Sequence, residues 1–144
     1  MMNWLIRILL VVIAIVVAVL TITALPTLDD KHMAGTRLMI HMMAGGSLVA
    51  AMPVFAILFL SRAISPQRSA ILQRWGFWLM ILAATLAIGS VLMCMLPLLS
   101  TEQMHRWMVI HGYAGFATGA ALLVLGLGCL QWRRISATRS STPG

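Results

Sequence analysis

Charged side chains are scarce in this chain, and acidic ones are almost absent. Of its 144 residues 9% are charged, and Asp and Glu together number three. A soluble globular domain carries about 25% charged residues, so this composition excludes an ordinary soluble domain. Hydrophobic residues make up 61% of the chain, which predicts a membrane protein.

Cysteine and the common catalytic motifs are also scarce. The two cysteines, Cys94 and Cys129, are expected near opposite faces of the membrane, which excludes a disulfide between them. Neither belongs to a C-x-x-C-H motif, which excludes covalent attachment of a c-type haem. The chain has no nucleophile elbow, phosphate-binding loop or zinc-binding helix motif. We therefore expect a subunit of a larger assembly rather than a stand-alone catalyst.

Four apolar stretches are long enough to cross a bilayer, which takes about 20 helical residues. They lie near residues 4–25, 38–60, 75–96 and 107–130. Lipid offers the backbone no hydrogen bonds, so each stretch must be helical. The first apolar run is too long for a signal-peptide core and is expected to be retained. The chain is thus expected to be an all-α membrane protein, a single four-helix transmembrane bundle with a disordered tail at residues 135–144.

Basic residues are distributed unevenly between the two sides of these helices. Three of them, Lys31, Arg37 and Arg106, share one side with all three acidic residues. The other side carries Arg7, Arg62, Arg68, Arg74, Arg133, Arg134 and Arg139. The positive-inside rule then predicts that both termini are cytoplasmic. It also explains the net charge of +7 without a nucleic-acid partner, and membrane lipid is the expected surrounding.

The phrase Ile-His-x-x-Ala-Gly occurs twice, in "MIHMMAGG" (residues 39–46) and in "VIHGYAG" (residues 109–115). Each phrase places a histidine, His41 or His111, inside an apolar run, where an ionisable side chain usually has a function. His41 follows Arg37 by four residues, and His111 follows Arg106 by five. At about 1.5 Å per helical residue, both imidazoles are expected at nearly one depth, close to the outer surface. The repeat also suggests two similar helical hairpins.

The neighbours of the two histidines match as well. Gly45 and Gly115 each lie four residues further along, one turn deeper on the histidine's face, and Gly119 extends the second stripe. Bare backbone of this kind suits a flat macrocycle, although small residues also let membrane helices pack closely. Arg37 and Arg106 would pair with haem propionates or act as interfacial anchors.

Imidazole nitrogen suits iron, and two such ligands close both axial positions. The pattern therefore predicts one b-type haem held by His41 and His111, with electron transfer as its chemistry. The structural alternative is a pair of buried histidines that are hydrogen-bonded to backbone carbonyls. It also stays open whether a methionine, Met42 or Met108, replaces one histidine as a ligand.

The phrases "TRLMIHMMAGG" and "HRWMVIHGYAG", within four expected helices, resemble the small membrane cytochrome b subunits of bacterial respiratory complexes. The resemblance covers mainly residues 36–60 and 105–130. It implies a multi-pass subunit of the bacterial inner membrane that passes electrons between quinone and a periplasmic or membrane redox partner. Larger members of this class hold two haems, whereas this chain has no histidine in its inner half. One haem near the outer face is therefore expected.

The remaining titratable residues lie in or beside the outer loops. His105 adjoins Arg106 and is a candidate partner for a propionate. Titratable side chains near the outer surface could accept the protons that are released when a quinol is oxidised. The candidates for this quinone and proton role are His32, Asp29, Asp30 and Glu102. A solvated loop position is the simpler reading of these side chains.

Two other functions fit the same residues. Thioether sulfur and imidazole both bind copper, and the outer half is rich in both. The copper candidates are His32, Met33, Met39, His41, Met42, Met43, Met104, His105, Met108 and His111. Copper, however, requires neither glycines below the histidines nor arginines above them. The second alternative is a membrane anchor or assembly subunit that carries no cofactor.

Overall fold

The computed structural model describes residues 4–29, 33–65 and 70–140, with side chains described for residues 4–27, 33–65 and 70–132. These residues form α1 (Trp4–Ala24), a short 3₁₀ helix η1 (Leu25–Asp29), α2 (Gly35–Ile64), α3 (Ile71–Met95) and α4 (Thr101–Ser140). All four α-helices are long and apolar enough to cross a membrane. The expectation of an all-helical chain with four membrane-spanning helices is confirmed.

Helices α2, α3 and α4 are longer than the apolar stretches that predicted them. The disordered tail expected at residues 135–144 is wrong for residues 135–140, because α4 continues to Ser140. Neither Gly nor Pro occurs between Gly128 and Pro143, so nothing in this segment breaks the helix once it has formed. Polarity marks where a helix leaves the lipid, not where it ends. Residues 141–144 lie outside the described residues.

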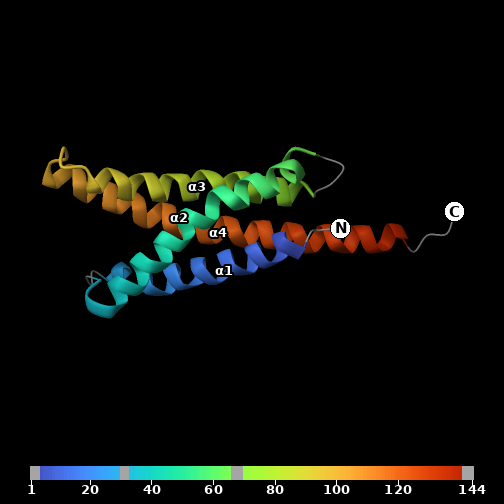
Figure 1. Ribbon diagram of the computed structural model, residues 1–144, viewed down its shortest axis with the longest axis horizontal. Helices are drawn as coiled ribbons and strands as arrows, with labels where there is room; N and C mark the ends of the chain where they lie inside the picture. The colour runs from blue at the N-terminus through green and yellow to red at the C-terminus, as the bar shows by residue number, and fades with distance from the viewer. Residues whose placement is uncertain (1–3, 30–32, 66–69, 141–144) are drawn as a thin grey trace.

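The four helices form two hairpins, α1 with α2 and α3 with α4 (Figure 1). The first part of α2 lies against α1, and the last part of α2 packs against α3 (Figure 1). Helix α1 also contacts α4, so that α2 and α4 face each other across the bundle. Both hairpin turns, η1 and the α3–α4 connection, lie at the same end of the molecule, which we call the η1 end.

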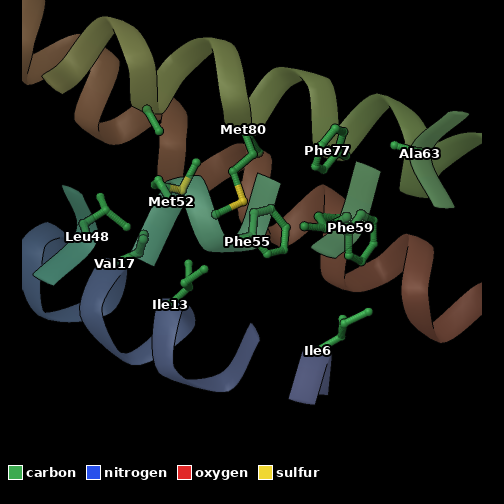
Figure 2. Packing of buried hydrophobic residues seen from close by; sticks show 13 residues of the cluster. Ile6, Ile13, Val17, Leu48, Met52, Phe55, Phe59, Ala63, Phe77 and Met80 are labelled. Carbon is green, nitrogen blue, oxygen red and sulfur yellow. The ribbon is translucent and has the colours of Figure 1, made fainter. Parts of the chain in front are cut away.

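A cluster of aromatic and aliphatic side chains fills the half of the bundle away from the η1 end. Phe55 and Phe59 of α2 stack with ring centroids 5.3 Å apart, and Phe59 stacks on Phe77 of α3 at 5.4 Å. Ile13 and Val17 of α1 close the cluster from the other side (Figure 2). On α2 every buried side chain lies from Leu48 onward, so residues 35–47 of this helix contribute no buried side chain to the core.

Helices α3 and α4 approach each other backbone to backbone at two glycines. A Cβ atom on Gly76 would collide with the backbone of Leu125, and one on Gly128 would collide with the backbone of Gln73. In lipid, where no hydrophobic force draws helices together, such close approach gives the van der Waals contact that holds a pair. These glycines make the α3–α4 hairpin one rigid unit.

Substitution Gly128→Ala is expected to lower the thermal stability of the detergent-solubilised protein. The added methyl group would contact backbone atoms, which cannot move aside as a flexible side chain could. Overpacking of this kind lowers the free energy of unfolding by about 1–3 kcal/mol. Gly126→Ala is the matched control, since a Cβ there meets nothing within 4 Å. Alanine is also the better helix former, so this control is expected to match or exceed the parent. Equal melting temperatures for the two variants would contradict the close approach.

Candidate functional site

His41 of α2 and His111 of α4 lie next to each other. Their ring centroids are 6.3 Å apart, and the ring planes are inclined by 81°. Both side chains are half-buried. Two histidines that stand 70 residues apart in the sequence are thus neighbours, as the nearly equal depth expected from their spacing to Arg37 and Arg106 suggested.

The imidazole of His41 is anchored to α1 through its Nδ1 atom. Nδ1 lies 2.8 Å from Thr23 Oγ1. The single hydroxyl proton of Thr23 is directed to the carbonyls of Val19, at 2.8 Å, and Leu20, at 3.0 Å. With the hydroxyl proton on a backbone carbonyl, Thr23 Oγ1 accepts a hydrogen bond from Nδ1–H of His41, which is the tautomer that this arrangement favours.

The imidazole of His111 is anchored to α3 in the same way. Its Nδ1 lies 3.0 Å from the carbonyl oxygen of Ala87 and 3.2 Å from Ser90 Oγ. Ser90 donates its own proton to the Ala87 carbonyl at 2.7 Å. Because a carbonyl oxygen only accepts, Nδ1 of His111 must carry the proton.

Each histidine is consequently held in one tautomer, with Nδ1 protonated and the lone pair on Nε2. Within the described residues, Nε2 of His111 has no hydrogen-bond partner, and the ring of His41 also bonds to the backbone of Leu20. Metal-binding histidines show this arrangement, in which the second ring nitrogen donates to a hydroxyl or carbonyl that sets the ring's orientation. Both rings are chemically ready to act as metal ligands.

The spacing of the two rings also suits one shared ion. A metal–imidazole bond of about 2.0–2.1 Å and about 1.1 Å from ring nitrogen to ring centre would place two axial imidazoles with centroids about 6.2–6.4 Å apart. The observed separation is 6.3 Å. An inclination of 81° is compatible with this arrangement, since each ring turns freely about its own metal–nitrogen bond.

Open space lies beside the glycines that follow each histidine. A Cβ atom added to Gly45 or Gly115 would meet nothing within 4 Å, and the same holds for Gly46 and Gly112. Gly119 differs, because a Cβ there would lie 3.5 Å from Thr21 Oγ1 of α1. The open stripe expected along α4 therefore ends at Gly115, and Gly119 allows α4 to pack on α1.

The structure pairs two residues to which the sequence gave separate roles. Arg106 forms an ion pair with Glu102 one turn earlier, and both side chains are exposed. Such an exposed pair contributes about 0–1 kcal/mol, so another carboxylate could readily replace Glu102. Arg37 and His105 are exposed as well, and within the described residues no hydrogen bond joins either of them or Arg106 to a histidine ring. Their assignment to propionates stays a prediction.

The remaining candidates from the outer loop lie largely outside the described structure. His32 and Asp30 fall outside the described residues, and Asp29 ends η1 without a described side chain. Glu102 is engaged with Arg106, as noted above. The quinone and proton roles predicted for these four residues have no structural test here.

The methionines near the histidines face outward. Met42 and Met43 are 62% and 68% exposed, and Met39 and Met108 are similarly open. Across the described residues there is no group of three or more His, Cys, Asp or Glu side chains that could hold a metal. The described site thus offers a pair of imidazoles rather than a complete cage of protein ligands.

Thr23, Ser90 and the Ala87 carbonyl did not enter the sequence analysis. A usable signal was nevertheless present, because Thr23 and Ser90 are hydroxyl residues placed 18 and 21 positions before His41 and His111. In hydrocarbon a hydroxyl needs a partner, and a histidine on the next helix at the same depth is a suitable one.

No protein-family model, curated protein or solved structure matches this chain. The resemblance to membrane cytochrome b subunits therefore stays a prediction, and the argument for function depends on the geometry of the two histidines.

Both imidazoles are expected to be neutral Nδ1–H tautomers in protein purified without bound metal. The measurement is ¹⁵N NMR of histidine-labelled protein in detergent, in which the two ring nitrogens have distinct shifts. Thr23→Val removes the hydroxyl beside His41 and should blur this distinction for that ring alone, whereas Ser90→Ala leaves the Ala87 carbonyl in place and should keep His111 as the Nδ1–H tautomer. His105, which is exposed, is the internal control and should show exchange between tautomers. An Nε2–H tautomer at either position would contradict the site geometry.

Proposed function

We propose that this chain is a b-type cytochrome subunit that carries electrons between the membrane quinone pool and a periplasmic or membrane redox partner. One haem would be held between His41 and His111, near the outer face of a bacterial inner membrane. The observation that carries this proposal is the neighbouring pair of imidazoles, with ring centroids 6.3 Å apart and each ring anchored at Nδ1.

A two-histidine site fits haem better than it fits a bare metal ion. A porphyrin already supplies four of the six iron ligands, so two imidazoles complete the coordination. A bare ion held only by this pair would lack ligands, since the described residues offer no third His, Cys, Asp or Glu beside it. The open backbone at Gly45 and Gly115 gives a planar group room next to the rings.

When bound, haem supplies one-electron chemistry, and two axial histidines leave no open position for oxygen. The chain's own residues do the rest of the work. Thr23, Ser90 and the Ala87 carbonyl hold both imidazoles at Nδ1, which leaves Nε2 to bind the iron. Arg37 and Arg106 would bind propionates at the η1 end, with Arg106 exchanging Glu102 for the new carboxylate.

The two hairpins share one arrangement of a histidine and a hydroxyl residue, which supports an origin by duplication. In each hairpin, the second helix carries the histidine and the first helix carries the hydroxyl that holds it. The matching phrases around His41 and His111 agree with this. With both termini cytoplasmic, as the distribution of basic residues indicates, the η1 end faces the periplasm.

The test is a reduced-minus-oxidised absorption spectrum of the purified chain beside its His41→Ala and His111→Ala variants. The parent is expected to show the Soret and α bands of a b-type haem, and both variants are expected to lose them. Tyr113→Ala is the control on α4, because Tyr113 is 75% exposed and takes no part in the pair. It should retain the bands.

Two results would contradict the proposal. A colourless protein that retains copper on elemental analysis would favour the copper site instead. A colourless protein without metal would favour the cofactor-free anchor.

A further inference from the structure

A groove runs between α2 and α3, next to the histidine pair. Its volume is about 360 Å³, within the range of about 300–1,000 Å³ common for small-molecule sites. The lining comes from both helices and includes Val49, Met52, Pro53 and Ala56 of α2 and Ile81, Thr85, Ile88, Gly89 and Leu92 of α3. No charged side chain lines it. Since the groove is apolar and open on one side, a neutral, lipid-soluble ligand suits it and a charged one does not.

One backbone carbonyl in this groove lacks its usual partner. Pro53 lies inside α2 and has no N–H group, so the Val49 carbonyl, four residues earlier, loses its helical hydrogen bond. Both residues line the groove. In lipid an unpaired carbonyl is costly, which makes it a strong acceptor for a ligand hydroxyl.

One hydroxyl in the groove lacks a partner as well. The hydroxyl groups of the helical residues Thr21 and Thr118 donate hydrogen bonds to the carbonyls of Val17 and Ala114, each at 2.8 Å. Thr85 makes no hydrogen bond within the described residues, and its side chain is exposed to the groove. The groove lining therefore includes a carbonyl that lacks its usual helical donor and a hydroxyl without a partner, in otherwise apolar walls.

The groove also adjoins the histidine pair. Ile88 and Gly89, which line it, belong to the same turn of α3 as Ala87 and Ser90, which hold His111. One face of this turn anchors the imidazole, and the next face forms the wall of the groove.

We infer that the α2–α3 groove binds the head group of a membrane quinone or quinol. The flat ring fits between the apolar walls, a quinol hydroxyl donates to the Val49 carbonyl, and the Thr85 hydroxyl donates to a ring oxygen. A lipid acyl chain would use neither polar group. This inference deepens the proposed function and rests on it for the choice of quinone, but it places the quinone in the groove rather than among the outer-loop acids.

The test measures binding of ubiquinone-1 to the chain in phosphatidylcholine nanodiscs, followed by quenching of tryptophan fluorescence. Thr85→Val removes the donor while keeping the shape of the side chain. Pro53→Ala restores an N–H group and so occupies the Val49 carbonyl. Each variant is expected to weaken binding about three- to tenfold, the loss of roughly one hydrogen bond.

Matched controls lie outside the groove. Ser47→Ala removes an exposed hydroxyl of α2 that bonds to the Met43 carbonyl, and Pro97→Ala replaces an exposed proline beyond α3. Both should bind ubiquinone-1 as the parent does. Pro53→Ala adds a helical hydrogen bond, and Thr85→Val changes one exposed side chain, so both groove variants are expected to fold.

Haem content is measured on the same samples, which separates this inference from the proposed function. Weakened quinone binding in colourless protein would support the groove although the haem proposal had failed. Unchanged binding in both groove variants would overturn the inference. Loss of haem from these variants with quinone affinity intact would also overturn it, because the groove would then belong to the haem.

Discussion

The hydrogen bonds at Nδ1 of His41 and His111 are the interactions on which the rest of the site depends. Each ties an imidazole on one helix to the other helix of its own hairpin, through Thr23 on α1 and through Ala87 and Ser90 on α3. Without them each ring could rotate and exchange its proton between nitrogens. With them, both rings are held in place by Nδ1, as metal-binding histidines are held by a hydroxyl or carbonyl.

Stability and the candidate function occupy different halves of the bundle. The phenylalanine cluster and the close approach at Gly76 and Gly128 hold the helices together away from the η1 end. The histidines lie toward the other end, where the start of α2 contributes no buried side chain. A packed half that fixes the helices allows the other half to keep open backbone and unpaired polar groups, which a well-packed core would exclude.

The sequence predicted those features that depend on periodicity and composition. Run length identified four helices, and similar spacing from Arg37 and Arg106 predicted that His41 and His111 lie at nearly one depth. It did not predict features that depend on how each helix is rotated, such as the Thr23 and Ser90 anchors or the contact of Gly119 with α1. The end of α4 was predicted too early because the prediction used the polarity of the tail, whereas a helix can continue through polar residues that include no Gly or Pro.

The most direct test of the account is low-temperature EPR of the oxidised protein, with iron and protein quantified in the same sample. The account predicts one low-spin ferric iron per chain. Because the imidazole planes are inclined by 81°, the signal should have the strong anisotropy of nearly perpendicular axial ligands. A high-spin signal would show that one histidine is not a ligand. A sample without iron would contradict the shared imidazole site itself.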